Sequence, residues 1–148
     1  MNTIKKKTFY LIGSLRNNYV RELELKLLAN CPNIDVFAEW HGAGNEADDH
    51  FKAYHQGRGR SFREALKTDS ARNIFEFDKA HLDSADGAIV ILPTGFSCAL
   101  EAGYVSHSGR PIHAIYPNGE PDQRWDIMVQ FLTSISYNEQ ELIEKLNA

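Results

Sequence analysis

The chain has 148 residues, a length typical of a single domain. Its 16 basic and 20 acidic residues give a formal charge of −4, which argues against a protein dedicated to binding nucleic acid. Apolar residues make up 43% of the chain and charged residues 24%, a balance typical of globular proteins rather than disordered ones.

The first predicted elements are a strand and a helix. Residues 8–12 form a short β-rich apolar run that ends at Gly13, which predicts a buried strand. Asn17 or Asn18 can cap a following helix, which ends before Pro32. The apolar positions on one side of this helix are Val20, Leu23, Leu27 and Leu28.

A second strand is predicted at 34–38, after which the sequence loses its regular pattern. The stretch from about 40 to 60 collects Gly, His, Asp and Arg, which predicts a long irregular connection. Connections of that length are uncommon in a compact domain and usually functional. Helical spacing returns at Ser61, and an apolar stripe between residues 69 and 85 is interrupted by Asp78.

The strongest strand signal is the continuous apolar run 87–92, which predicts a strand buried on both faces, as parallel strands are. Residues 93–96 follow as a loop, and a helix from about 97 to 108 ends at Gly109. The remaining predicted elements are a strand at 111–115, a helix near 125–132, a short strand near 135 and a helix at 138–147.

Strands that alternate with helices indicate a parallel sheet covered by helices on both faces. Because crossover connections are right-handed, few topologies remain. We predict an α/β fold with a five-stranded flavodoxin-like (Rossmann-like) parallel sheet in a single domain, residues 1–148. Ligands bind such sheets beyond the carboxyl ends of the strands. The loops after Ile12, Ala38 and Leu92 are therefore expected to line one crevice.

The sequence predicts neither a membrane partner nor a metal site. The longest apolar run, 88–93, is far shorter than the roughly 20 residues of a membrane-spanning helix. No apolar leader follows the first methionine, so we expect a cytoplasmic protein. Cys31 and Cys98 are 67 positions apart, which indicates neither a disulfide framework nor a zinc motif. The six histidines have no ligand spacing, and we expect no metal and no cofactor.

Two carboxylates are candidates for chemistry. Asp78 interrupts an apolar stripe, and burial of an unpartnered carboxylate is costly, so it either occupies a cleft or points sideways into water. Glu101 lies one turn into the helix after the buried strand, at the rim of the predicted crevice. It is either a functional group or a favourable partner of the helix dipole.

The loop after the first strand is a candidate anion site. Gly13-Ser14-Leu15-Arg16 opens a helix, where backbone N–H groups, a hydroxyl group and a guanidinium group favour negative charge. The loop is neither a Rossmann fingerprint nor a P-loop. An ordinary turn with a surface arginine is the alternative.

Together these segments resemble the nucleoside 2-deoxyribosyltransferase family, including its branch of 2′-deoxynucleoside 5′-monophosphate N-hydrolases. The resemblance covers most of the chain, in order. Its segments are 10–16 (YLIGSLR), 77–78 (FD), 82–86 (LDSAD), 100–104 (LEAGY) and 109–111 (GRP).

The resemblance implies cleavage of the N-glycosidic bond of a (deoxy)nucleoside or its 5′-monophosphate. Glu101 would attack C1′ of the sugar and form a glycosyl ester, and Asp78 would donate a proton to the leaving base. Tyr10 would orient Glu101 by a hydrogen bond. The sugar then passes to water in a hydrolase or to another nucleobase in a transferase, and both outcomes stay open.

The same resemblance assigns substrate-binding residues. Gly13, Ser14 and Arg16 would hold a 5′-phosphate, because a planar guanidinium fork suits that group. Six positions before the nucleophile, transferases of the family often carry an aspartate and the hydrolase branch a serine. This chain has Gly95 there, and Ser97 is the nearest hydroxyl group.

Subunits of that family complete each other's pockets, which implies a homodimer or a larger homo-oligomer. Segment 125–128 is expected at this interface because it carries aromatic and methionine side chains, and Met128 would contact substrate. Ordinary helix packing is the alternative for this segment. The stretch 40–60 has no counterpart in the family.

Two other functions are consistent with the sequence. An NAD-type glycohydrolase also needs a glutamate in a flavodoxin-like cleft, and the arginine-bearing loop could bind its pyrophosphate. A non-catalytic module that binds a nucleotide belongs to a different class entirely.

Overall fold

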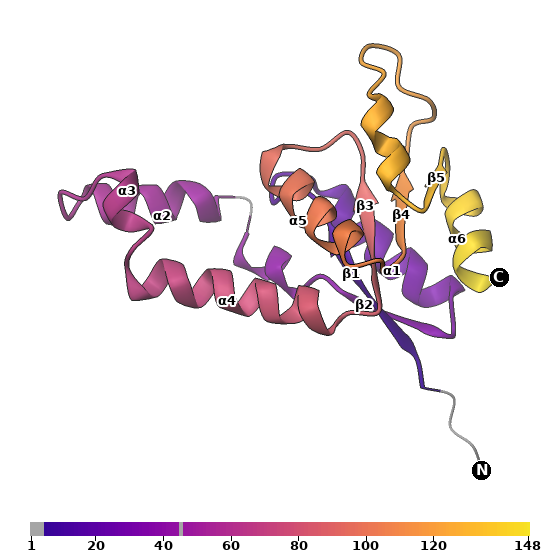
Figure 1. Cartoon of the computed structure of the whole chain (residues 1–148), viewed down its shortest axis with the longest axis horizontal. Coiled ribbons are helices and arrows are strands. Elements are labelled where there is room, and N and C mark those ends of the chain that lie inside the picture. The colour runs from indigo at the N-terminus through magenta and orange to yellow at the C-terminus, as the bar shows by residue number, and fades with distance from the viewer. Residues whose placement is uncertain (1–4, 45) are drawn as a thin grey trace.

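A single parallel sheet forms the centre of the computed structural model, which describes residues 5–44 and 46–148 (Figure 1). Its strands are β1 (Lys7–Ile12), β2 (Ile34–Phe37), β3 (Gly87–Ile91), β4 (Ile112–Ile115) and β5 (Ser134–Ser136). Their order is β2-β1-β3-β4-β5, and each neighbouring pair is parallel. The predicted five-stranded flavodoxin-like sheet is confirmed.

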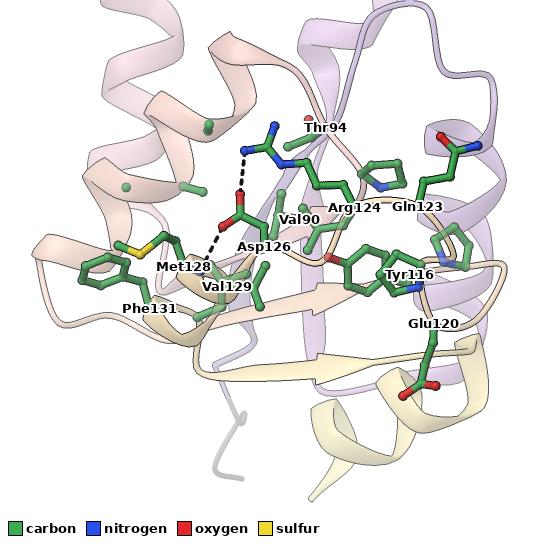
Figure 2. A pocket seen from close by; sticks show the side chains of 18 of the residues that line it. Val90, Thr94, Tyr116, Glu120, Gln123, Arg124, Asp126, Met128, Val129 and Phe131 are labelled. Carbon is green, nitrogen blue, oxygen red and sulfur yellow. Dashed lines mark hydrogen bonds and ion pairs between the residues drawn. The ribbon is translucent and has the colours of Figure 1, made fainter.

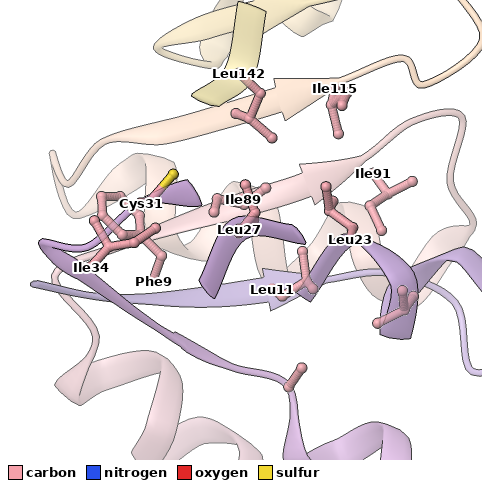
Figure 3. Packing of buried hydrophobic residues seen from close by; sticks show 12 residues of the cluster. Phe9, Leu11, Leu23, Leu27, Cys31, Ile34, Ile89, Ile91, Ile115 and Leu142 are labelled. Atoms are coloured by element: carbon pink, nitrogen blue, oxygen red, sulfur yellow. The ribbon is translucent and has the colours of Figure 1, made fainter. Parts of the chain in front are cut away.

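Helices cover both faces of the sheet, as predicted. The main helices are α1 (Tyr19–Asn30), α4 (Asp69–Ser84), α5 (Phe96–His107) and α6 (Glu139–Asn147). On one face, Leu23 and Leu27 of α1 lie in a buried cluster with Leu11 of β1, Ile89 of β3 and Leu142 of α6 (Figure 3). Burial of each such side chain stabilises the fold by about 1.5–3 kcal/mol, so this cluster fixes α1 and α6 against the sheet.

The opposite face carries α4 and α5. Tyr10 of β1 and Phe37 of β2 lie in a second buried cluster with Leu82 of α4 and Cys98 of α5. Successive side chains of a strand point to opposite faces, so Tyr10 faces α4 and α5 whereas Leu11 faces α1. Every residue of β3 is buried, which confirms the expectation of a strand covered on both sides.

The stretch from 40 to 60 is largely helical, so the prediction of an irregular connection is wrong. It contains the 3-10 helix η1 (Glu39–Ala43) and α2 (Ala47–Gln56), and the short α3 (Phe62–Ala65) follows. Ala47, Phe51 and His55 recur every four residues and form the inner side of α2. With the first half of α4, α2 and α3 extend away from the sheet (Figure 1). We call residues 47–76 the arm.

A buried histidine joins the parts of the arm. His55 is 2% exposed. Its Nδ1 lies 3.1 Å from Nη1 of Arg60, and its Nε2 lies 3.4 Å from Oγ of Ser70. Because a guanidinium group only donates, Nδ1 accepts, and the proton on Nε2 is directed to Ser70. Burial and the charges of Arg60 and Arg58 lower the pKa of His55, which favours the neutral ring.

Two other predicted elements differ in the structure. The apolar stripe of α4 is not buried along its length: Ile74 and Phe75 are exposed because the first half of α4 belongs to the arm. Segment 125–132 forms the short 3-10 helix η2 (Ile127–Phe131), whose start is closed by the Asp126 carboxylate accepting from the N–H of Met128. Across the described ranges, no helix combines the length and apolar character that crossing a membrane requires.

The close approach of β3 and β4 predicts an effect of substitution at Gly87. A Cβ atom there would lie 2.6 Å from the carbonyl oxygen of Pro111 and 2.9 Å from Cε1 of Phe9. Gly87→Ala is expected to lower the free energy of unfolding by about 1–3 kcal/mol, because backbone has to move. Urea denaturation followed by circular dichroism measures this change.

Gly103→Ala is the matched control, because a Cβ atom at that helical position meets nothing within 4 Å. Its expected effect is neutral or stabilising by up to about 1 kcal/mol, since alanine favours a helix. Equal stability of the two variants would contradict the tight packing at Gly87.

Candidate active site

Glu101 lies in the second turn of α5, the helix that follows β3. Its side chain is half-buried, and its carboxylate accepts a hydrogen bond from the hydroxyl group of Tyr10. Tyr10 is 1% exposed and belongs to β1. The position of this donor is therefore fixed by the sheet itself.

The surroundings of Glu101 oppose its ionisation. Burial and the negative charge of Asp78 raise the pKa of Glu101 from its ordinary value of 4.5 to about 7, although the hydrogen bond from Tyr10 acts in the opposite direction. The carboxyl group therefore changes its charge close to neutral pH. Shifts of this size are concentrated at functional sites.

The second carboxyl group is that of Asp78, on α4. Asp78 is half-buried, and burial raises its pKa while the nearby His81 lowers it. The charge of Asp78 in turn raises the pKa values of Glu101 and Tyr10. Three elements, β1, α4 and α5, thus bring together the three residues that the resemblance assigned to catalysis. We call Tyr10, Asp78 and Glu101 the acid cluster.

Aromatic packing holds α4 beside the acid cluster. His81 lies one turn after Asp78 and stacks on Phe37, with ring centroids 3.9 Å apart and 10° between the planes. Phe77 meets the same histidine ring edge-on at 4.7 Å. Sequence reasoning did not single out His81 as a neighbour of the carboxyl groups. Its spacing of three residues from Asp78 on one helix was the available signal.

The segments after β1, β2 and β3 meet at one edge of the sheet, as the predicted crevice requires. Nε1 of Trp40, in η1, donates to the carbonyl oxygen of Leu11 at 2.8 Å. A Cβ atom on Gly13 would lie 2.8 Å from Val20 and 3.4 Å from Ile91 at the end of β3. Glycine at this position therefore lets the β1 loop pack closely between α1 and β3.

Ser14 and Arg16, the expected anion-binding pair, form hydrogen bonds with other groups of the protein. Oγ of Ser14 accepts from the backbone N–H of Arg16 at 3.2 Å. The guanidinium group of Arg16 lies against Asp49 of α2, with Nη2 3.2 and 3.0 Å from the two carboxylate oxygens. Sequence reasoning missed Asp49 because it assigned no helix to this stretch, although the spacing of Ala47 and Phe51 indicates one.

Gly95 and Ser97 lie at the beginning of α5. Gly95 is the N-cap residue, and its carbonyl oxygen accepts from the N–H of Ala99 at 3.1 Å. A Cβ atom on Gly95 would meet nothing within 4 Å, and Ser97 is exposed in the first turn. The start of the helix that carries Glu101 is therefore open to a ligand.

A cavity of about 1250 Å³ lies on the other side of α5, between this helix and segment 116–132 (Figure 2). The side of α5 that lines it carries Ala99, Gly103 and Ser106 rather than Glu101. The side chains of Arg124 and Asp126 point toward each other there, with Nη2 of Arg124 3.4 Å from Oδ2 of Asp126. Met128 also lines this cavity. Within one chain, α5 therefore lies between Met128 and the acid cluster. The expected contact of Met128 with substrate stays a prediction, in which Met128 of one subunit reaches the acid cluster of another.

Comparisons of the chain with protein-family models and with curated proteins found no match. Within residues 5–44 and 46–148, no group of three or more His, Cys, Asp or Glu side chains is arranged to hold a metal ion. The acid cluster itself offers a phenol and two carboxyl groups of raised pKa, which are suited to proton transfer and to nucleophilic attack.

The raised pKa of Glu101 predicts a pH-dependent effect on stability. Ionisation of Glu101 costs more in the folded chain than in the unfolded one, so the penalty is absent below about pH 4.5 and complete above about pH 7. Glu101→Gln removes this penalty and is expected to raise the free energy of unfolding by about 2–3 kcal/mol at pH 8. No such gain is expected at pH 4.

Urea denaturation at the two pH values measures this difference. Glu76→Gln, at an exposed position of α4, serves as the control and is expected to change stability little at either pH. A gain for Glu101→Gln that is the same at pH 4 and pH 8 would contradict the raised pKa of Glu101 in the folded chain.

Proposed function

We propose that the protein cleaves the N-glycosidic bond of a (deoxy)nucleoside or its 5′-monophosphate, as nucleoside 2-deoxyribosyltransferases and the related N-hydrolases do. The observation that carries the proposal is the acid cluster, in which the charge of Asp78 raises the pKa of Glu101 and Tyr10 donates to Glu101. Retaining cleavage of a glycosidic bond requires two carboxyl groups, one as nucleophile and one as acid.

The reaction proceeds in two displacements. The carboxylate of Glu101 attacks C1′, the bond between C1′ and the base nitrogen breaks, and the base leaves with the proton of Asp78. The product of this step is a glycosyl ester of Glu101. Water or a nitrogen atom of a second nucleobase then attacks C1′, its proton passes to the Asp78 carboxylate, and Glu101 is released. Two inversions retain the configuration at C1′.

One proton on the pair of carboxyl groups is essential to this mechanism. Below pH 7 the raised pKa of Glu101 favours that proton on Glu101 in the free protein. Attack requires the proton on Asp78 instead. The hydrogen bond from Tyr10 favours this transfer because it stabilises the Glu101 anion, and burial of Asp78 favours its protonated form.

The loops beside the acid cluster are suited to the remainder of the substrate. Arg16 and Ser14 follow β1, and Ser97 lies in the first turn of α5, so these polar groups come from the edge where the adjacent strands β1 and β3 end. A guanidinium group and hydroxyl groups are suitable partners for a 5′-phosphate. Gly95 leaves space for that group at the start of α5.

The active protein is proposed to be a homodimer or larger homo-oligomer. Large apolar side chains are exposed along α5 and η2, and the hydrogen bond from Ser106 to the carbonyl oxygen of Phe131 holds these two elements together. Several large apolar side chains exposed on neighbouring elements are typical of an interface. The exposed apolar side chains on α5 and around η2 include Phe96, Leu100, Trp125, Ile127, Met128 and Phe131.

Release of free base tests the proposed activity. The purified protein is incubated with deoxynucleosides, deoxynucleoside 5′-monophosphates and NAD, and chromatography detects the free base. Glu101→Ala is expected to reduce release by about a thousandfold or more, since the nucleophile is lost. Asp78→Asn is expected to slow release by about a hundredfold, because the base then leaves without a proton. Glu76→Gln is the control at an exposed position of α4.

The same assay separates the alternatives. Nicotinamide release from NAD would favour a glycohydrolase of that cofactor, and nucleotide binding without turnover would favour a binding module. Full activity of Glu101→Ala would refute the proposed nucleophile, and full activity of Asp78→Asn on an unactivated substrate would refute the proposed acid.

Sedimentation velocity tests the proposed oligomer. Leu100→Asp places a charge on the exposed apolar side of α5 and is expected to shift the protein toward monomer, because a buried unpaired charge is costly. Leu25→Asp is the matched control: Leu25 is 52% exposed and Leu100 60%, but Leu25 belongs to α1 on the opposite face of the sheet. The same distribution of monomer and oligomer for the two variants would place the interface elsewhere.

A further inference from the structure

An ion pair joins the β1 loop to the arm. Arg16 belongs to the loop after β1, and Asp49 lies in the first turn of α2, more than thirty positions later. Nη2 of Arg16 reaches both carboxylate oxygens of Asp49, and both side chains are largely exposed. Asp49 therefore occupies a donor that the proposed function gives to a substrate phosphate.

A carboxylate and a phosphate compete for a guanidinium group, because both are anions that accept its N–H groups. Exposed ion pairs such as this one are weak, so a phosphate dianion can displace Asp49. The displaced carboxylate stays nearby on α2 and repels the same dianion. Asp48 adds a second negative charge to that turn of the helix.

We propose that Asp49 is a specificity-determining residue that competes with the 5′-phosphate of a substrate for Arg16, and this inference rests on the proposed function. The competition weakens binding of phosphorylated substrates and leaves substrates without a phosphate largely unaffected. The ratio of kcat/KM for phosphorylated substrates to kcat/KM for substrates without a phosphate is thereby set by a residue of the arm rather than by the acid cluster.

The first measurement is binding of inorganic phosphate by calorimetric titration. Asp49→Asn is expected to bind phosphate about threefold to tenfold more tightly than the unaltered protein, since it frees Arg16 and removes a nearby negative charge. Asp48→Asn is the matched control: it removes the same charge from the neighbouring residue, which lies outside the ion pair with Arg16. Its expected effect is about twofold or less.

The second measurement compares kcat/KM for a deoxynucleoside 5′-monophosphate with that for the matching deoxynucleoside. Asp49→Asn is expected to raise the ratio of the two by the same threefold to tenfold. In an Arg16→Ala background the effect of Asp49→Asn on phosphate binding and on this ratio is expected to disappear, because the two residues act through one contact.

Several outcomes would overturn the inference. They are unchanged or weaker phosphate binding by Asp49→Asn, an equal gain in Asp48→Asn, a gain that persists without Arg16, and no measurable phosphate binding by either protein. Phosphate binding that responds as expected in a protein that releases no base would refute the proposed function alone. Base release with no response to Asp49→Asn would refute the role of Asp49 alone.

Discussion

Two carboxyl groups, those of Asp78 and Glu101, share a partly buried space beside the hydroxyl group of Tyr10. Their loss of hydration and mutual repulsion destabilise the fold, and packing elsewhere has to outweigh that cost. The sheet order makes the arrangement possible. Because β1 lies next to β3, the helices on either side of β3 in the sequence, α4 and α5, both come to lie over Tyr10.

Contacts outside the acid cluster keep α4 and α5 in this relation. Arg110 donates from Nη1 to the carbonyl oxygens of Leu82 and Ala85, the latter at 2.8 Å, and so satisfies the carboxyl end of α4. The hydroxyl group of Tyr104 on α5 donates to Asp83 on α4. Arg110, just before β4, and Tyr104 of α5 thus contribute to the position of Asp78 through contacts at the carboxyl end of α4.

The sequence was sufficient for the sheet and for part of the site, because those features depend on local patterns. The continuous apolar run 87–92 predicts a strand buried on both faces, and the position of Glu101 after it follows from the strand and loop that precede it. Helix α2 was not predicted, because glycines and charges around it hide a spacing of only three inward-facing residues, Ala47, Phe51 and His55. The ion pair of Arg16 with Asp49 and the stacking of His81 arise from tertiary packing, which residue spacing does not encode.

The adjacency of β1 and β3 also governs how the chain assembles. Thr8 donates its N–H to the carboxylate of Asp86, which is 78 positions later, and β2, α2, α3 and α4 all lie between them. Closing so long a loop costs conformational entropy, but each doubling of its length adds only about 0.6 kcal/mol, so the helices inserted after β2 cost little thermodynamically. Their effect is kinetic. The pair β1–β3, one of the two that involve the central strand, joins residues far apart in the sequence, and a sheet built on such pairing folds slowly for its size.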